Sequence, residues 1–317
     1  MPKIQLIRNS TSYQNALTIA PSLLSNELKN NEVRIKIIST TVLHYDRKVI
    51  EGSTTEVFPI GYDLGTSATG TIVDLAPNVS GFDIGDNVLI VRHPRFQGVW
   101  KNETVVPVSC ICHAPETQQI TNCVSLGYGG NIAMSSLYRT TKDPIIKHGN
   151  NVVIIGTLNT VCFYIAQLAL YSGAKAVTIV TRESHPLEEA LKIDNRISIQ
   201  HIGVELFTKF DIMIALDVEW HSYLNSLKEG AYVSVFSSHP PLNVIEKLNT
   251  NNITWEYKPL LPNREFMEYY TSLIDDGVLH LPIQTKKQEF NLKNTISSLQ
   301  SLERNLFIGD IVLFNKN

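Results

Sequence analysis

The feature that most constrains the fold is a strand, a turn, a helix and a second strand in immediate succession near the middle of the chain. Residues 151–155 form a short apolar run that ends in Gly156, and residues 160–171 repeat apolar side chains at helical spacing. Gly173 ends the helical pattern, and residues 176–180 are a second apolar run. A helix that connects two such short strands predicts a crossover that leaves the strands parallel.

The same alternation continues downstream. Residues 210–216 form another apolar run, residues 222–228 have a helix-like pattern that stops at Gly230, and residues 232–236 form a further strand. Repeated strand, helix and strand units are typical of an α/β fold with a doubly wound parallel sheet of the Rossmann type. We therefore place a nucleotide-type domain at about residues 118–258.

The segments on either side of this domain are rich in strand patterns. Val33, Ile35 and Ile37 alternate with polar residues, and Gly, Pro and Asp turns separate the runs that follow. The remaining expected elements are strands at 70–73, 87–91, 104–108 and 310–314 and helices at 263–276 and 292–302. The sequence predicts a β-rich substrate domain, an irregular antiparallel barrel, made from residues 1–117 and 259–317.

Charge and hydropathy exclude several classes of partner. The 27 basic and 30 acidic residues give a formal charge of −3 and are spread along the chain, so we expect no nucleic-acid or anionic membrane surface. The longest apolar stretches are shorter than the ~20 residues of a membrane span, and the N-terminus lacks the apolar run of a signal peptide. The 4 cysteines are irregularly spaced, which does not fit a disulfide framework. We expect a cytoplasmic protein with reduced thiols that acts on a small molecule.

Four dispersed segments resemble the medium-chain dehydrogenase/reductase superfamily in order and spacing. They are Gly61-Tyr62-Asp63 leading through Gly70 into Ile72-Val73, the Phe-x-x-Gly-Asp-x-Val turn at 82–88, Gln167-Leu168-Ala169 with Gly173-Ala174, and the closing segment 308–313. In the turn, we expect Gly85 to take a positive φ and Asp86 to bond neighbouring amides. The resemblance covers essentially the whole chain and implies a Rossmann-type domain inserted in a GroES-like β-rich domain.

The resemblance also bears on zinc. Zinc-dependent members resemble Cys-His-Thr-Asp and Gly-His-Glu where this chain has Leu43-His44-Tyr45-Asp46 and Gly61-Tyr62-Asp63. A catalytic zinc needs about three protein ligands, and the expected cysteine and histidine positions are both lost, so we expect no catalytic zinc. The four-cysteine structural zinc loop is missing as well, and we interpret Cys110 and Cys112 as buried strand cysteines. The resemblance therefore points to the zinc-free branch of quinone oxidoreductases and enoyl reductases.

The expected cofactor loop departs from the family pattern. Relatives resemble Gly-Ala-Ser-Gly-Gly-Val-Gly where this chain reads Gly156-Thr157-Leu158-Asn159-Thr160-Val161-Cys162, and the first six of these residues are our candidate pyrophosphate contacts. We expect Asn159 to adopt the left-handed conformation and Thr160 to cap the helix while donating its hydroxyl to a phosphate. Cys162 stands where glycine is usual, and we expect its side chain to push the helix outward.

Two further segments complete the expected cofactor site. Thr181 and Arg182 end the second strand of the domain, where NAD-preferring relatives place Asp or Glu, so Arg182 favours NADPH while Glu183 offsets part of its charge. A solvated loop arginine is the alternative interpretation. Ser237 and Ser238 fall where relatives pass the backbone beside the nicotinamide, although a plain turn also fits them.

The candidate catalytic residues come from the first domain. A zinc-free reductase needs a positioned hydride donor and one hydrogen-bond donor to the carbonyl oxygen that gains charge. Tyr45, His44 or Lys48 can serve as that donor, and Tyr62 is expected to line the same cleft, with Tyr128 and Asn131. Structural or surface roles fit the first three residues as well. We interpret Asp46 as an orienting or capping carboxylate.

Two functions remain open at this point. The first is an NADPH-dependent, zinc-independent reductase of a quinone or an activated carbon–carbon double bond. The second is a degenerate family member that has lost dinucleotide binding and acts as a non-redox enzyme, such as a cyclase or isomerase, or as an interaction protein. A homodimer is expected through an edge strand such as residues 232–236.

Overall fold

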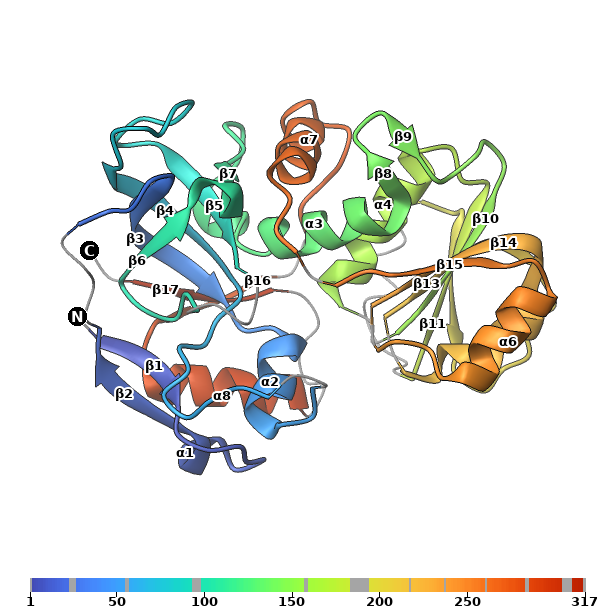
Figure 1. The fold of residues 1–317 in the computed structure, drawn as a ribbon, viewed down its shortest axis with the longest axis horizontal. Helices are drawn as coiled ribbons and strands as arrows, with labels where there is room; N and C mark the ends of the chain where they lie inside the picture. Colours follow the sequence, from blue (N-terminus) through green and yellow to red (C-terminus); the bar gives the residue numbers. More distant parts are fainter. Residues whose placement is uncertain are drawn as a thin grey trace. The chain divides into compact units, whose positions relative to one another are not determined.

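A computed structural model of the chain describes residues 2–22, 27–54, 57–92, 98–156, 159–182, 194–216, 218–236, 238–259, 261–282, 285–303 and 310–315. The chain divides into two compact units, residues 1–131 with 261–317, and residues 132–260 (Figure 1). The first unit therefore takes its chain from both ends of the sequence. The domain limits at 118 and 258 stay a prediction, because compactness in space does not define where a family domain begins.

The second unit is built on a parallel sheet of six strands in the order β12-β11-β10-β13-β14-β15 (Figure 1). Every neighbouring pair in it runs parallel. The chain starts at β10, builds outward to β12, returns and builds outward again from β13, so the fold class expected from the alternating pattern is confirmed. The elements are β8 (Tyr138–Thr140), β9 (Asp143–Pro144), β10 (Asn151–Ile155), α4 (Thr160–Tyr171), β11 (Ala176–Thr181), β12 (Ile197–His201), β13 (Phe210–Ala215), the 3-10 helix η3 (Val218–Ser226), β14 (Leu227–Val235), α6 (Leu242–Thr250) and β15 (Thr254–Tyr257).

Helices pack against this sheet through apolar faces. Val244 and Leu248 of α6 join a buried cluster with Val153 and Ile155 of β10, which points one face of the strand at α6. Figure 1 shows α4 on the other side of the sheet. Residues 160–170 of α4 are all buried, as expected of a helix that is apolar around most of its circumference.

One prediction for this unit holds only in part and another is wrong. The helix expected at 222–228 is present only in part: residues 222–226 lie in the 3-10 helix η3, whereas Leu227 and Lys228 are already in β14, where Leu227 pairs with Phe210. The apolar spacing therefore marks a short helix that ends before the strand, and the register of β14 against β13 shifts between Leu227 and Tyr232. Residues 232–236 are not an edge strand, because β14 lies between β13 and β15 in the described sheet.

The first unit is built on a sheet with the order β16-β17-β3-β4-β5-β7, with β6 also paired to β3. Its pairs are antiparallel except for β16 with β17. The elements are β1 (Pro2–Leu6), α1 (Tyr13–Ala16), β2 (Leu17–Pro21), β3 (Glu32–Thr41), α2 (His44–Glu51), β4 (Ser67–Leu75), β5 (Asn87–Val91), β6 (Glu103–Pro107), η1 (Val108–Cys110), β7 (Ile111–His113), η2 (Ile120–Asn122), α7 (Arg264–Asp275), β16 (Thr285–Glu289), α8 (Leu292–Glu303) and β17 (Asp310–Phe314). Helix α3 (Leu126–Leu137) begins in this unit and ends in the second. The expected β-rich character is confirmed.

Local predictions in the first unit mostly hold. Gly85 has a φ of 102°, and Asp86 accepts a hydrogen bond from the Asp83 backbone amide at 2.8 Å, so both expected features of the turn are confirmed. All four cysteines are free and buried. Cys112 lies on β7 as expected, whereas Cys110 belongs to the short helix η1.

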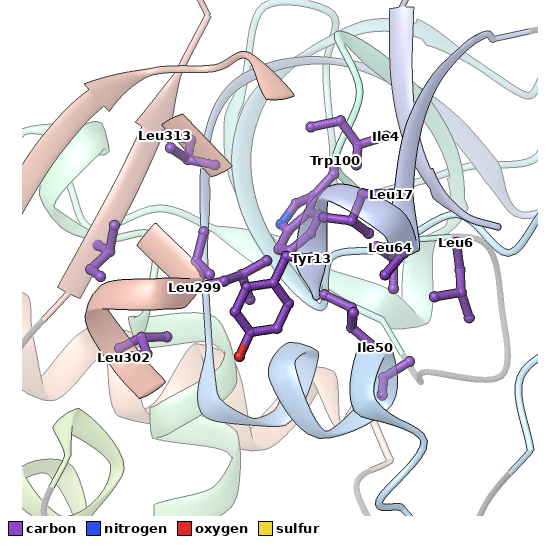
Figure 2. Packing of buried hydrophobic residues seen from close by; sticks show 14 of the residues in the cluster. Ile4, Leu6, Tyr13, Leu17, Ile50, Leu64, Trp100, Leu299, Leu302 and Leu313 are labelled. Carbon is purple, nitrogen blue, oxygen red and sulfur yellow. The ribbon is translucent and has the colours of Figure 1, made fainter. Parts of the chain in front are cut away.

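A core shared by both ends of the chain holds the first unit together (Figure 2). Tyr13 and Trp100 are its largest side chains, and Leu299 and Leu302 of α8 pack beside them. The Trp100 indole donates a hydrogen bond to the Thr41 carbonyl oxygen at 2.9 Å, so its polar atom is satisfied inside the core. The C-terminal segment is therefore an integral part of the unit that carries α2.

Candidate functional site

The crevice expected for a dinucleotide begins where β10 ends. In a doubly wound sheet, ligands bind outside the carboxyl ends of the strands where the strand order reverses, which here lies between β10 and β13. Gly156 follows β10 and donates its amide to the Val180 carbonyl oxygen at 3.0 Å. A Cβ at Gly156 would lie 2.8 Å from the Leu216 Cβ, so this position takes only glycine unless Leu216 moves. The first glycine of the expected loop is therefore at a place that requires it.

The start of α4 differs from the expectation. Asn159 has an extended backbone, with φ −150° and ψ −179°, and its side-chain oxygen accepts hydrogen bonds from the Val161 amide at 2.9 Å and the Cys162 amide at 3.3 Å. Asn159 is thus the N-cap, and Thr160 is the first helical residue. The predictions of a left-handed Asn159 and a Thr160 cap are both wrong, because an asparagine oxygen reaches the second and third amides of a helix only from an extended backbone.

Other members of the expected loop are only partly visible. Cys162 is fully buried, so the helix accommodates a thiol where relatives have glycine. Thr157 and Leu158 lie outside the described residues, so the expected widening of the loop stays a prediction. Thr160 and Val161 are both buried.

The end of β11 carries an ion pair that the sequence did not predict. Thr181 is buried, and Arg182, with 59% of its side chain exposed, forms a salt bridge with Glu219, the second residue of η3. Because β11 and β13 lie on opposite sides of β10, this pair spans the carboxyl end of β10. Glu219 therefore balances the charge of Arg182, whereas Glu183, from which we expected that effect, lies outside the described residues.

The segment after β14 is described only in part. Ser238 is half-buried, and Ser237 lies outside the described residues. His239 packs edge-on against Trp255 of β15, with ring centroids 5.2 Å apart. The aromatic neighbours give this segment an apolar side.

In the first unit, Asp46 organises the candidate catalytic segment. Its carboxylate accepts hydrogen bonds from the Leu43 amide at 2.8 Å and from the Thr66 hydroxyl at 3.0 Å, and the side chain is buried. Burial raises the pKa of Asp46 to about 7, against the opposing effect of both hydrogen bonds. The interpretation of Asp46 as a capping carboxylate is confirmed, since it holds the first turn of α2.

His44 and Lys48 lie one helical turn apart on α2. Burial, with a smaller contribution from the Arg47 and Lys48 charges, lowers the pKa of His44 to about 4. His44 is therefore neutral at pH 7, so its imidazole can donate or accept a hydrogen bond but does not carry a positive charge there.

Tyr45 and Tyr62 each pack against the core shown in Figure 2. The Tyr62 ring also lies 4.8 Å from the Phe58 ring, measured between centroids. All four predicted catalytic residues therefore belong to the first unit, and two of them share one apolar cluster. Burial and the Asp46 charge raise the pKa of Tyr128, so that hydroxyl is a donor and not a phenolate at neutral pH.

Asn131, which we expected in the cleft, has a structural role. It is fully buried, donates to the Leu261 carbonyl oxygen at 3.0 Å and accepts from the Asn263 amide at 3.1 Å. It thereby ties α3 to the segment that leads into α7.

Asp63, the residue after Tyr62, anchors two lysines. Its carboxylate oxygens lie 3.1 Å from the Lys101 Nζ and 2.7 Å from the Lys3 Nζ. Asp63 and Lys101 are both buried. Sequence reasoning missed this cluster because its members are 38 and 60 residues apart. Within the described residues, no group of three His, Cys, Asp or Glu side chains is placed to hold a metal ion.

Comparisons with known proteins agree with this architecture. The family described as "Alcohol dehydrogenase GroES-like domain" matches residues 29–150. A zinc-type alcohol dehydrogenase-like protein of Staphylococcus aureus is 24% identical over 311 residues, which covers 90% of this chain and 91% of that protein. The quinone oxidoreductase of Coxiella burnetii has a TM-score of 0.81 at 18% identity and covers 100% of this chain and 99% of its own.

The quinone oxidoreductase of Escherichia coli, solved with NADPH, has a TM-score of 0.81 at 16% identity, covering 99% of this chain and all of its own. The fold agrees with these two structures over essentially the whole chain, and the GroES-like match covers residues 29–150. These matches support the medium-chain dehydrogenase/reductase superfamily, whose two-domain fold the chain shares. The chain keeps the glycine at 156 and has Leu43 and Tyr62 at the two positions where zinc-type sequences resemble Cys and His. Among its described helices, none has the length and apolar character needed to cross a membrane.

Proposed function

We propose that this medium-chain reductase transfers hydride from NADPH to a quinone or to an activated carbon–carbon double bond, without zinc. The observation that carries the proposal is Arg182 at the carboxyl end of β11, beside the crevice between β10 and β13. A guanidinium at this position favours a 2′-phosphate, whereas a carboxylate would favour the free ribose hydroxyls. An oxidoreductase function agrees with the names of the proteins that share this fold.

The residues of the chain fit the phosphate end of a dinucleotide in two respects. At position 156 a Cβ would overlap Leu216, and because glycine has none, the backbone can turn tightly after β10. The α4 amides of Val161 and Cys162 point at a single acceptor, which at present is the Asn159 oxygen. When bound, the cofactor supplies the hydride. Thr181 and Arg182 would hold its adenosine end, and Ser237 and Ser238 would pass beside its nicotinamide.

The substrate side requires a hydrogen-bond donor for the oxygen that gains negative charge. Tyr45 and Tyr62 are supported in this role because packing against one apolar cluster fixes their rings. His44, neutral at pH 7, can donate from one ring nitrogen, and Lys48 supplies a charge one turn further along α2. Asp46 positions the helix that carries all three α2 residues.

Zinc independence is part of the proposal. The names of the curated relatives contain "zinc-type", yet this chain has an aliphatic residue at 43 and a phenol at 62, neither of which is a zinc ligand of ordinary catalytic sites. Asp63, the remaining carboxylate of the second motif, is engaged by two lysines. Dialysis against a chelator should leave turnover unchanged.

A thermal-shift titration tests the proposal. At ~100 times its dissociation constant, NADPH should add about 2.7 kcal/mol of stability, which raises the melting temperature by roughly 5 °C or more. The expected shift should shrink in Arg182→Gln and persist in the matched control Arg196→Gln, an exposed arginine paired with Asp194 in the same unit. A flat melting curve with both NADPH and NADH would overturn the assignment.

A second candidate function is favoured by one observation. The Asn159 oxygen already satisfies the two α4 amides that a pyrophosphate needs, which supports a family member that no longer takes a dinucleotide and acts as a cyclase, an isomerase or an interaction protein. Turnover of NADPH with a panel of simple quinones and enones would exclude this candidate.

The assembly and location remain proposals as well. We propose a cytoplasmic homodimer that pairs through β15, an edge of the described parallel sheet, in place of the interior strand at 232–236. Light scattering should give twice the chain mass. Glu256→Pro, in the middle of β15, should shift the measured mass toward that of the monomer.

A further inference from the structure

The salt bridge between Arg182 and Glu219 occupies the place where the proposed cofactor would lie. Strands in a sheet are about 4.8 Å apart, so β11 and β13, which flank β10, are separated by roughly 10 Å. Arg182 and Glu219 close this distance with two long side chains that meet over the end of β10. The carboxyl edge of β10, followed by Gly156, lies beneath them.

Glu219 changes what Arg182 offers to a ligand. A 2′-phosphate carries about −1.5 to −2 charges at pH 7 and binds best to an arginine whose donors are available. Because Glu219 pairs with the Arg182 guanidinium, a 2′-phosphate must displace the Glu219 carboxylate. The phosphate then stays close to that carboxylate, which repels it. Both side chains are accessible, at 59% and 38% exposure, so this exchange requires no unfolding.

The Glu219 carboxylate can also serve in binding NADH. Proteins that prefer NADH hold the ribose 2′-hydroxyl with an Asp or Glu near the end of the second strand, because a carboxylate is a strong acceptor for that hydroxyl. Glu219 comes from a different segment, after β13, yet its contact with Arg182 brings its carboxylate to the end of β11. One position therefore presents a donor for a phosphate and an acceptor for a hydroxyl.

We propose that Glu219 is a specificity-determining residue that keeps the adenosine end of the crevice permissive, so that NADPH and NADH bind within about a factor of ten of each other. The inference rests on the proposed dinucleotide function. Arg182 supplies the contact to NADPH, Glu219 supplies the contact to NADH, and each weakens the contact that the other makes.

The test compares dissociation constants for NADPH and NADH at low salt in the whole chain and in four variants. Glu219→Gln should strengthen NADPH binding three- to fivefold, in line with the energy of an exposed ion pair, and weaken NADH binding about twofold, because the glutamine oxygen still accepts from the ribose hydroxyl but without the charge. Arg182→Gln should shift the ratio the other way. The double variant should show that the two effects are not additive. Glu246→Gln, which removes an exposed charge on α6 of the same unit, is the matched control.

Adenosine 2′,5′-bisphosphate and AMP separate this inference from the proposed function, because they probe the adenosine end alone. If the whole chain binds either dinucleotide and Glu219→Gln behaves like Glu246→Gln, the inference is overturned and the proposed function stands. If no dinucleotide binds, the proposed function fails and the inference fails with it, even where Glu219→Gln gains affinity for the bisphosphate over AMP. Absence of binding of all four compounds to every variant overturns both.

Discussion

The buried carboxyl of Asp46 gives a prediction whose size follows from the structure. Its pKa rises from 3.8 in the unfolded chain to about 7 in the folded one, mainly through burial. This difference of roughly 3 units corresponds to about 4 kcal/mol, because each unit is worth ~1.4 kcal/mol. A group whose folded pKa is raised favours the folded state while it is protonated, so the cost of ionising it is absent below pH 4 and complete above pH 7.

The substitution Asp46→Asn removes this cost while keeping the contacts. An asparagine oxygen can accept from the Leu43 amide, and its NH₂ group can donate to the Thr66 hydroxyl, which accepts as well as donates. We expect the variant to match the wild type within ~1 kcal/mol at pH 4.5 and to exceed its stability by up to about 4 kcal/mol at pH 8.

Urea unfolding of both proteins at half-unit steps from pH 4.5 to 8.5 measures the difference. Asp83→Asn, which removes an exposed carboxylate from the turn before β5, is the control and should give no such slope. A variant that is less stable than the wild type by the same amount at every pH would refute the reasoning, since folding would then leave the pKa of Asp46 unshifted.

Three further predictions follow from the contacts. Gly156→Ala should lower the stability by about 1–3 kcal/mol in urea unfolding because its Cβ overlaps Leu216, and Leu216→Ala in the same chain should recover part of the loss. Asp63→Asn should lower the free energy of unfolding by ~3–5 kcal/mol, because it removes the carboxylate that faces the buried Lys101. The double variant Asp63→Asn with Lys101→Met should recover most of that loss in urea unfolding, and equal losses in the single and double variants would contradict this. Asn159→Ala should lower the melting temperature by the loss of ~1 kcal/mol of helix capping, whereas Asn159→Gly should cost only a few tenths, and equal shifts would argue against the cap.

Much of the fold was predictable because local patterns coincide with elements. The helix expected over residues 160–171 is α4 to the residue, and the strands at 151–155 and 310–314 are β10 and β17. Each of these segments is bounded by a turn residue and has one dominant apolar period. The helix expected at 222–228 was found only over 222–226, as part of a 3-10 helix, because its few apolar residues do not show where the helix ends and β14 begins.

The candidate site was less predictable than the fold. The sequence singled out Gly156 and Arg182 from their places after two strands, which depend only on local order. It gave no signal for Glu219, which reaches Arg182 across 37 residues. It also assigned the α4 cap to Thr160, because a one-residue difference in where a helix begins cannot be resolved from residue preferences when both neighbours are good caps.

The sequence by itself determined the alternation of strands and helices, the absence of the zinc-type residues at 43 and 62, and the resemblance to medium-chain reductases. These are properties of residue type and of order along the chain. Only the tertiary structure decided that Asn159 occupies the α4 amides, that Glu219 meets Arg182 over the end of β10, and that Asp63 holds two lysines. The contacts of Glu219 and of Asp63 join segments that become neighbours only after the sheets have formed. The Asn159 cap depends on the backbone conformation of one residue. No local sequence pattern encodes this geometry.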